Sequence, residues 1–315
     1  MPRPTVALVN DTSLYEHHFG CQLVCQTFRE QFARVGLELR LALPFEFRVD
    51  EVHARLATVD LVVVNGEGSL HHGRGSHLLR LAESYPTALV NCVYQSNGLS
   101  PALRSFRFRS ARESLSAAEI RSAGVACDVT PDLLFASQML RSYAPPLATE
   151  ELGFTDSVER RWRRYGPFRR RFGFSPYVSL PSQYLDKLCS FRRICAGRFH
   201  AAVACSVLGV PFSTWDSNSW KTRGLMRDMG VERFHFSSFE AAVAHVPKTM
   251  DDSIAQFAVA AVARIEGMFD KLALIARDVQ RERGRRIDGL GVDVQSPGDR
   301  AGADEFKGPS LRSAG

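Results

Sequence analysis

Four short apolar runs, separated by stretches with helical spacing, constrain the fold of this chain more than any other sequence feature. The runs are Val6–Val9, Leu39–Leu43, Leu61–Val64 and Ala88–Val90. Between the first two runs, residues 22–35 form an amphipathic stretch. Strands that alternate with helices form βαβ units in a parallel sheet, and apolar runs this continuous are typical of strands buried on both faces. The sequence therefore predicts a Rossmann-like α/β domain over residues 1–140.

A shorter α/β alternation follows the proline-containing stretch Arg141–Glu150, which we interpret as a linker. The expected strands are Leu152–Thr155, Tyr177–Leu180, Arg193–Ala196 and Phe212–Trp215. They predict a compact second Rossmann-like domain over residues 151–250, followed by a helix over residues 251–282. Residues 283–315 are poor in apolar side chains, so we expect a disordered tail there. The two domains should face each other across a cleft at the carboxyl ends of their strands, where α/β proteins bind ligands.

Composition narrows the class of protein. The chain has 315 residues, of which 45% are hydrophobic and 23% charged, as in soluble globular proteins. It contains neither an apolar run long enough to span a membrane nor a recognisable signal peptide, so we expect a cytoplasmic protein. The seven cysteines follow neither a disulfide framework nor zinc-ligand spacing, so buried free thiols are expected and no metal site. The net charge of +6 predicts an anionic partner: a phosphorylated substrate, a nucleic acid or an acidic lipid surface.

Two segments that follow strands carry polar side chains suited to ligand binding. Residues 65–73 come directly after the third strand and combine glycines, which let the backbone approach a ligand, with a glutamate and two histidines for proton transfer. Residues 10–20, after the first strand, form a connection longer than most, and long polar loops there are often functional. The alternative for residues 65–73 is a surface turn with solvated histidines, and for residues 10–20 it is an insertion without a function. The candidate substrate-binding residues are Asp11, His18, Gly66, Glu67, Gly68 and His71.

Arg112 lies where a strand is expected to meet a helix. Apolar and basic residues alternate from Phe106, as they do in a strand. A helix is expected to run to Ser122, with Ser116 and Glu119 forming its capping box. A guanidinium group at this junction can bind a carboxylate or a phosphate through two parallel hydrogen bonds. The alternative is an arginine that meets only solvent.

The segment Cys195–Val203 gives the sharpest prediction of an anion site. A strand is expected to end within it, and a helix of small residues to continue to Leu208. Arg198 and His200 then lie in the first turn of that helix, where free backbone N–H groups and the helix dipole favour an anion. Lys221 follows the next strand and can reach the same cleft. The alternative is a helix start with incidental polar residues.

The arginine-rich segment Arg160–Arg171 is first interpreted as a solvated helix face. Such a face could also contact a charged polymer or an anionic membrane surface. No RNA-recognition or helix-turn-helix signature accompanies it, so we do not expect nucleic acid as a partner.

Five segments in this order, over residues 5 to about 235, resemble the polysaccharide pyruvyltransferase family. They are the glycine-acid segment after the third strand, Arg112-Glu113-Ser114, Thr130-Pro131-Asp132-Leu133, Arg198-Phe199-His200 with Gly209-Val210-Pro211, and Lys221 before Leu225–Gly230. The resemblance implies two domains arranged as in B-type glycosyltransferases. It also implies phosphoenolpyruvate as a co-substrate, with no other cofactor. Members of the family form a cyclic pyruvate ketal across two sugar hydroxyls.

The resemblance also suggests roles for individual residues. The phosphate-binding arginines of the family correspond to Arg112 and Arg198, and its characteristic histidine corresponds to His200, which we expect to do acid–base chemistry. Asp132 and Lys221 are further candidate substrate-binding residues. The expected acceptor is a cell-surface saccharide or its precursor. Acceptors in such pathways are often lipid-linked, in which case Arg160–Arg171 would contact the inner face of the membrane.

Two other functions remain open at this stage. One is a nucleotide-sugar-dependent glycosyltransferase of similar fold, which would be stabilised by nucleotide. The other is a non-catalytic saccharide-binding relative that has kept the fold. The presence of Arg112, Arg198 and His200 argues against the second alternative.

Overall fold

The computed structural model describes residues 2–14, 17–158 and 173–289. The described residues up to Gln280 form one compact unit, and residues 281–289 belong to a second one. The expected arginine-rich helix over residues 160–171 and the tail from residue 290 lie outside the described residues. None of the helices in the described ranges combines the length and the apolar character that a membrane span requires.

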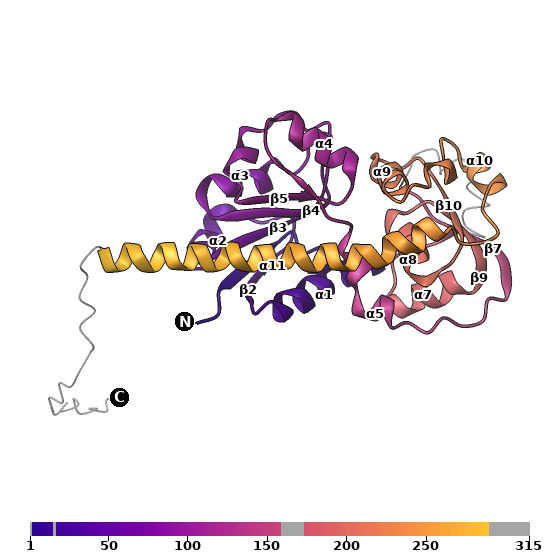
Figure 1. Ribbon diagram of the computed structural model, residues 1–315, viewed down its shortest axis with the longest axis horizontal. Helices are drawn as coiled ribbons and strands as arrows, with labels where there is room; N and C mark the ends of the chain where they lie inside the picture. Colours follow the sequence, from indigo (N-terminus) through magenta and orange to yellow (C-terminus); the bar gives the residue numbers. More distant parts are fainter. Residues whose placement is uncertain (1, 15–16, 159–172, 290–315) are drawn as a thin grey trace, which may run out of the picture. The chain divides into compact units, whose positions relative to one another are not determined.

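The first sheet consists of six parallel strands in the order β2-β1-β3-β4-β5-β6 within the described residues (Figure 1). The strands are β1 (Thr5–Val9), β2 (Glu38–Leu43), β3 (Leu61–His71), β4 (Thr87–Gln95), β5 (Phe108–Ala111) and β6 (Asp128–Val129). Every residue of β1 is buried, as expected for a central strand covered on both faces. Because β1 pairs with β2 on one side and β3 on the other, the strand order reverses between β1 and β3. Ligands of open α/β sheets bind at such a reversal.

The second sheet has five parallel strands in the order β11-β10-β9-β7-β8, again within the described residues. The strands are β7 (Glu150–Thr155), β8 (Gly173–Phe174), β9 (Phe191–Ala196), β10 (Phe212–Trp215) and β11 (His235–Phe236). Here the strand order reverses between β7 and β9. The two parallel sheets with alternating helices confirm the predicted α/β class.

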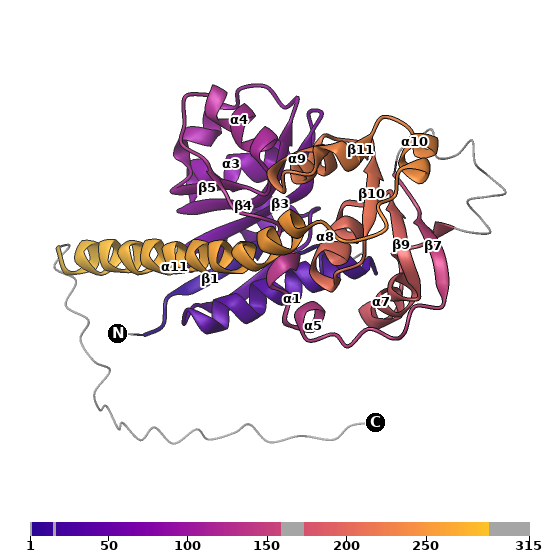
Figure 2. The same ribbon diagram turned by 45° about the vertical axis from the view of Figure 1, so that its right-hand side comes forward.

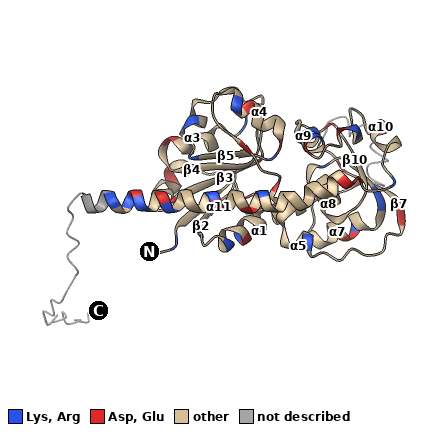
Figure 3. Ribbon diagram, viewed as in Figure 1, with Lys and Arg blue, Asp and Glu red and all other residues tan. Residues whose placement is uncertain are grey.

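Helices connect the strands and cover the sheets. The α-helices are α1 (Phe19–Arg34), α2 (Val49–Leu56), α3 (Ser76–Ser84), α4 (Ser114–Ser122), α5 (Gln138–Arg141), α7 (Pro181–Cys189), α8 (Phe199–Leu208), α9 (Lys221–Asp228), α10 (Phe239–Ala244) and α11 (Asp252–Gly289). The 3₁₀ helices are η1 (Thr12–Leu14), η2 (Pro101–Ser105), η3 (Leu133–Ala136) and η5 (Glu232–Phe234). Figure 3 shows charged residues mainly on helices and connections, whereas the strands carry few. This distribution keeps the cost of burying charge low.

Helix α11 shares one apolar core with elements of both sheets (Figures 1 and 2). Its Phe269 ring lies edge-on to the rings of Phe28 and Phe32 on α1, with centroids 5.8 and 5.5 Å apart. Near its other end, Phe257 packs in the same way against Phe135 of η3. The helix extends to Gly289, beyond the expected end of the helix at residue 282.

The expected strand Tyr177–Leu180 is wrong. The strand that pairs with β7 on the side away from β9 is β8, which ends before Pro176. After that proline, Tyr177 forms an isolated antiparallel bridge with His18, and the chain then bends into α7 at Pro181. Proline cannot donate a sheet hydrogen bond, and proline at the first helical position favours a helix start. The backbone around Tyr177 therefore holds the start of α1 instead of extending the second sheet.

The glycine-acid segment after the third strand is not a loop. Strand β3 continues through it to His71, pairing with β4 across a register shift between Glu67 and Leu70. Gly66 permits the close approach, because a Cβ atom there would lie only 2.1 Å from the Cβ of Cys92 on β4. The expected flexible turn is therefore a bulged extension of a buried strand.

The N-terminus of α4 is capped differently from the expected Ser116–Glu119 capping box. The Glu113 side chain accepts hydrogen bonds from the backbone N–H groups of Leu115 and Ser116. Burial raises the pKa of Glu113 to about 7, although these hydrogen bonds act in the opposite direction. A glutamate one turn earlier therefore does the capping, and the helix begins at Ser114.

Candidate functional site

The strand reversals of both sheets contribute to one small pocket, which we call the inner pocket. Its volume is about 200 Å³. The lining residues are His18, Cys21, Glu67, Gly68, Arg112, Val158, Tyr177, Arg198, Phe199, His200, Ser217 and Lys221. Glu67 and Gly68 belong to β3, whereas Arg198 follows β9. The pocket therefore lies where the topology of each sheet favours a ligand.

Arg112 supplies a buried cation directly after β5. Its side chain is only 2% exposed, and Nη1 donates to Oδ2 of Asp132 at 2.9 Å. The guanidinium group lies 4.0 Å from the centre of the Phe199 ring. Its Nε is buried with no hydrogen-bond partner among the described residues. A buried donor without a partner is costly, so this nitrogen is suited to receive an anionic ligand.

Asp132 does not line the inner pocket but holds Arg112 in place. Burial alone would raise the pKa of Asp132, but the His200 ring, the Arg112 charge and the Leu134 N–H together lower it to about 2. Its Oδ1 accepts from the N–H of Leu134 at 3.0 Å, so the carboxylate also caps η3. Asp132 is therefore a positioning residue at this site.

Arg198 lies at the N-cap of α8. Its Nε and Nη2 donate to Oδ1 and Oδ2 of Asp156 at 2.9 and 2.6 Å, an arrangement that fixes the plane of the guanidinium group. The side chain of Arg198, the N-cap residue, accepts no hydrogen bond from the backbone N–H groups in the first turn of α8. The positive end of the helix dipole and a fixed cation therefore meet at the same edge of the inner pocket.

His200 lies between two carboxylates. Its Nε2 is 3.6 Å from Oε1 of Glu67 and 3.7 Å from Oδ2 of Asp132, and it has no hydrogen-bond partner among the described residues. The ring packs against Gly20, where an added Cβ would come within 2.3 Å of it. The imidazole is therefore held at the pocket wall with a nitrogen available for proton transfer.

Lys221 begins α9 and adds a third basic group. Its Nζ donates to Oδ1 of Asn218 at 2.7 Å. Burial, and then the charges of Arg112 and Arg198, lower the pKa of Lys221 to about 7. A bound anion would stabilise the charged form, because opposite charges favour ionisation.

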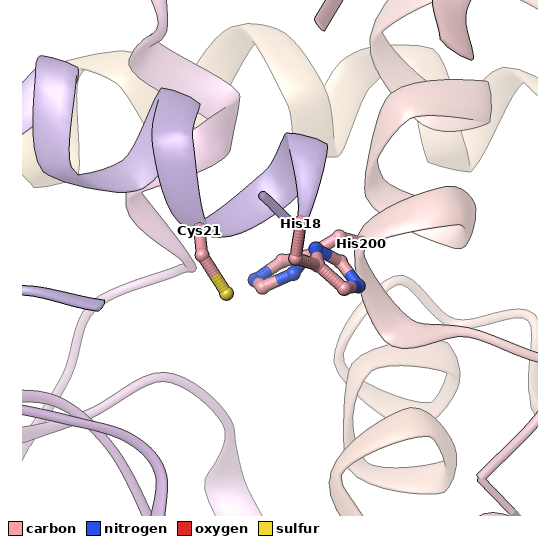
Figure 4. A group of neighbouring side chains, drawn as sticks. All are labelled: His18, Cys21 and His200. Atoms are coloured by element: carbon pink, nitrogen blue, oxygen red, sulfur yellow. The ribbon is translucent and has the colours of Figure 1, made fainter. Parts of the chain in front are cut away.

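His18, Cys21 and His200 cluster at the rim of this pocket (Figure 4). Each offers a potential metal-ligand atom within 4.8 Å of the other two. However, Nδ1 of His18 accepts from the N–H of Gly20, so the neutral ring carries its proton on Nε2. Burial, and then the charge of His200, lower the pKa of His18 and keep it neutral. A metal-binding histidine normally donates its second N–H outward, so this arrangement does not fit a metal ion.

Glu67 occupies a strained backbone position, with φ of 25° in a non-glycine residue. Its Oε2 accepts hydrogen bonds from Thr12 at 2.8 Å and Asn65 at 3.2 Å. Its Oε1 accepts from the thiol of Cys21 at 3.1 Å. Asn65 is itself held by Asn10 and Asn91. Several buried polar groups thus fix the carboxylate in one place.

A larger pocket, which we call the outer pocket, adjoins the inner one. Its volume is about 650 Å³. The lining residues are Thr12, Cys21, Pro44, Phe45, Glu46, Glu67, Gly68, Ser69 and Arg74. The two pockets share Cys21, Glu67 and Gly68. Glu67 therefore stands at their junction.

Besides Asp132, three predicted substrate-binding residues line neither pocket. Asp11 is buried, and its carboxylate pairs with Nη2 of Arg29 at 2.5 Å. Gly66 lies where β3 and β4 approach each other closely, so it has no room for a ligand. His71 is buried at the end of β3, where burial, followed by the charge of Lys221, lowers its pKa to about 4. By contrast, the predictions at His18, Glu67, Gly68, Arg112, Arg198, His200 and Lys221 all fall on residues that line the inner pocket.

Sequence reasoning missed several residues of the two pockets. Cys21 was interpreted as an ordinary buried thiol, although its place in the first turn after a strand-end loop could have indicated a pocket. Phe45 follows β2, and Tyr177 was assigned to a strand. Asp156 lines neither pocket but orients Arg198, and it follows β7 directly. The rule that predicted Arg112, that functional side chains follow the ends of strands, could have predicted it.

Comparison with known proteins supports the fold and gives no family. No protein-family model matches the chain, and no match is found among curated proteins. Among solved structures, the chain is similar to a functionally uncharacterized protein from Klebsiella pneumoniae, with a TM-score of 0.54 and 14% identity. That match covers 75% of this chain and 93% of the other.

Two further structures give lower scores. An O-GlcNAc transferase from Thermobaculum terrenum matches over 90% of this chain and 69% of its own, with 11% identity and a TM-score of 0.47. A carbohydrate transporter solute-binding protein from Agrobacterium radiobacter, in complex with D-arabinose, matches over 83% of this chain and 89% of its own, with 12% identity and a TM-score of 0.27. At these scores neither structure carries an argument about fold or ligand.

Proposed function

We propose that this protein transfers the pyruvyl group of phosphoenolpyruvate to hydroxyl groups of a saccharide, forming a cyclic pyruvate ketal. The observation that carries the proposal is the convergence of Arg112, Arg198 and Lys221 with His200 on one pocket of about 200 Å³. All four of these residues lie in the five sequence segments that resemble polysaccharide pyruvyltransferases. The pocket joins anion-binding groups to a group that can transfer a proton.

The charges of the inner pocket suit the donor. Phosphoenolpyruvate carries a phosphate and a carboxylate on a three-carbon skeleton. The buried Arg112 Nε, which lacks a partner among the described residues, can donate to one of these groups. Arg198 and the N-terminus of α8 can bind the other. Both arginines are already oriented by carboxylates, so little reorganisation is needed when the donor binds.

The chemistry requires one proton donor and cationic stabilisation of the leaving phosphate. Protonated His200 adds a proton to the methylene carbon, and C2 becomes electrophilic. A sugar hydroxyl attacks C2, phosphate departs, and a second hydroxyl closes the ketal. A positioned histidine typically contributes roughly 10²–10⁴-fold to such a step. The fixed arginines stabilise the charge that develops on the departing phosphate.

A nucleotide-sugar glycosyltransferase is the competing function. Ligand sites for molecules of that size generally occupy about 300–1,000 Å³, which is larger than the inner pocket. The basic residues gather in the smaller pocket, whereas the larger one has two carboxylates in its lining. This separation of basic and acidic side chains favours a small donor with two anionic groups over a nucleotide sugar.

The first experiment is a thermal shift assay with phosphoenolpyruvate, inorganic phosphate and a panel of nucleotide sugars. A ligand at 100 times its Kd adds about 2.7 kcal/mol, which corresponds to a shift of several degrees. We expect phosphoenolpyruvate to stabilise the protein and Arg198→Ala to abolish the shift. Arg192→Ala is the matched control, because that exposed arginine lies on β9, the strand that precedes Arg198, outside the pocket and pairs with Glu151.

Stabilisation by a nucleotide sugar alone would refute pyruvyl transfer. Turnover is then tested as phosphate release from phosphoenolpyruvate that depends on added saccharide. His200→Ala should lower this release by roughly 10²-fold or more while leaving the donor-dependent thermal shift in place. Wild-type turnover in that variant would refute the assignment of His200.

A further inference from the structure

The outer pocket differs from the inner pocket in its chemistry. Two carboxylates, Glu46 and Glu67, lie in its lining against one guanidinium group, that of Arg74. Hydroxyls of Thr12 and Ser69 complete the polar part of the wall. An anionic ligand would therefore be repelled, whereas a ligand rich in hydroxyl groups finds both acceptors and donors.

Phe45 gives the outer pocket a flat apolar wall. Its ring lies edge-on to His77, with centroids 4.9 Å apart, and Nε2 of His77 bonds to the backbone oxygen of Phe45 at 2.9 Å. The Arg74 guanidinium lies 5.9 Å from the ring centre. These contacts hold the ring in place next to the cavity. A fixed aromatic face with convergent polar groups is suited to a pyranose ring, which has apolar C–H faces and polar edges.

Glu67 connects this pocket to the proposed reaction. Its Oε1 lies 3.6 Å from Nε2 of His200, at the boundary of the two pockets. Its Oε2 is occupied by Thr12 and Asn65, so the carboxylate cannot turn freely. A hydroxyl that projects from the outer pocket toward the inner one would meet Oε1.

We infer that the outer pocket binds an uncharged saccharide as acceptor and that Glu67 takes the proton of its attacking hydroxyl. The saccharide oxygen bonds to C2 of phosphoenolpyruvate as its proton passes to Glu67, and His200 protonates the methylene carbon to a methyl group. The bond from C2 to the phosphate oxygen breaks, with its electron pair leaving on phosphate. The second hydroxyl bonds to C2, and its proton passes to His200, which becomes protonated again. The proton on Glu67 leaves with phosphate.

The proton step rests on the proposed pyruvyl transfer, but saccharide binding can be measured without it. Saturation-transfer NMR detects binding of methyl hexopyranosides to the full-length protein, with inorganic phosphate present instead of phosphoenolpyruvate. We expect signal from neutral glycosides and not from glucuronate. Phe45→Ala should weaken binding roughly tenfold, the cost of losing one aromatic face.

Phe47→Ala is the matched control. Phe47 also packs against His77, with centroids 5.7 Å apart, but it does not line the outer pocket. Equal loss of binding in the two variants, or a preference for glucuronate or a nucleotide sugar, would overturn the inference. The thermal shift with phosphoenolpyruvate is recorded on the same samples. A shift without glycoside binding refutes the acceptor pocket alone, and glycoside binding without a shift refutes the donor proposal alone.

Glu67→Gln tests the proton step separately. The amide keeps the size of the side chain and can still accept from Thr12, so glycoside binding should weaken far less than turnover. Saccharide-dependent phosphate release should fall by roughly 10²-fold or more, because the proton acceptor is lost. Unchanged turnover would refute the role of Glu67 while leaving the saccharide pocket in place.

Discussion

The ion pair between Asp132 and Arg112 predicts that neutralising one carboxylate will destabilise the whole protein. Asp132 is fully buried and Arg112 nearly so. In Asp132→Asn the side chain keeps its size, and its amide oxygen can still accept from the N–H of Leu134. The change therefore removes the negative charge beside Arg112 and His200 with little change in packing.

The size of the effect follows from the pKa of Asp132. Its pKa is lowered from 3.8 to about 2, and each pKa unit corresponds to ~1.36 kcal/mol, so the native environment favours the charged form by about 2 kcal/mol. Because the pKa is depressed in the folded state, this stability is fully present above about pH 4 and is lost as the pH falls through about 2. Leaving a buried cation unpaired costs about 3–5 kcal/mol in other proteins, so a loss of roughly 2–5 kcal/mol is expected at pH 7.

Thermal unfolding at pH 7 measures this loss. At roughly 2–4 °C per kcal/mol for domains of 150–250 residues, the lower bound of the expected loss corresponds to about 4–8 °C. Asp128→Asn is the control, because Asp128 is 46% exposed and pairs with Lys271 on the surface, where such pairs contribute about 0–1 kcal/mol. If both variants melt within a degree or two of the wild type, the Arg112 pair does not carry the stability argued here.

Three further changes test the geometry of the site and its surroundings. Gly20→Ala places a Cβ within 2.3 Å of the His200 ring and should lower turnover by about 10²-fold through misplacement of the imidazole; normal turnover would contradict this packing. Because the pKa of Lys221 is about 7, Lys221 should strengthen phosphoenolpyruvate binding more at pH 6 than at pH 8, so the calorimetric affinity ratio of the wild type to Lys221→Met should fall over that range. Gly224→Ala brings a Cβ within 2.3 Å of the carboxylate that caps α4 and should lower the free energy of unfolding, measured by urea titration, by about 1–3 kcal/mol. Gly267→Ala, in open space on α11, should instead be neutral or stabilising in the same urea titration.

The strand pattern of the sequence was sufficient for the fold class because buried parallel strands are continuous apolar runs. Val6–Val9 and Leu61–Val64 fall within β1 and β3, and the carboxyl ends of these strands reach the candidate site. Element ends were predicted less well. The sequence contains Pro176 and Pro181, yet Tyr177–Leu180 has enough apolar character to mimic a strand, and only its pairing with His18 reveals its role.

The site residues that could be predicted are those whose positions are set by the nearby sequence. Arg112 and Arg198 could be predicted because strand-to-helix junctions place side chains at the edge of a parallel sheet. Asp11 satisfied the same rule but turns to Arg29, and a partner on the following helix cannot be read from spacing alone. The role of Phe45 depends on which strands are neighbours, and that information is set by the long-range order of the sheets.

The course of α11 has a consequence for how substrates enter. Figures 1 and 2 show this helix alongside both α1 and α8, and its apolar side chains belong to the same core as residues of both sheets. Hinge bending between the two sheets would have to open this shared core, which exposes apolar surface to water at a substantial free-energy cost. The shared core therefore favours access to the inner pocket through rearrangement of side chains at its rim, without separation of the two sheets.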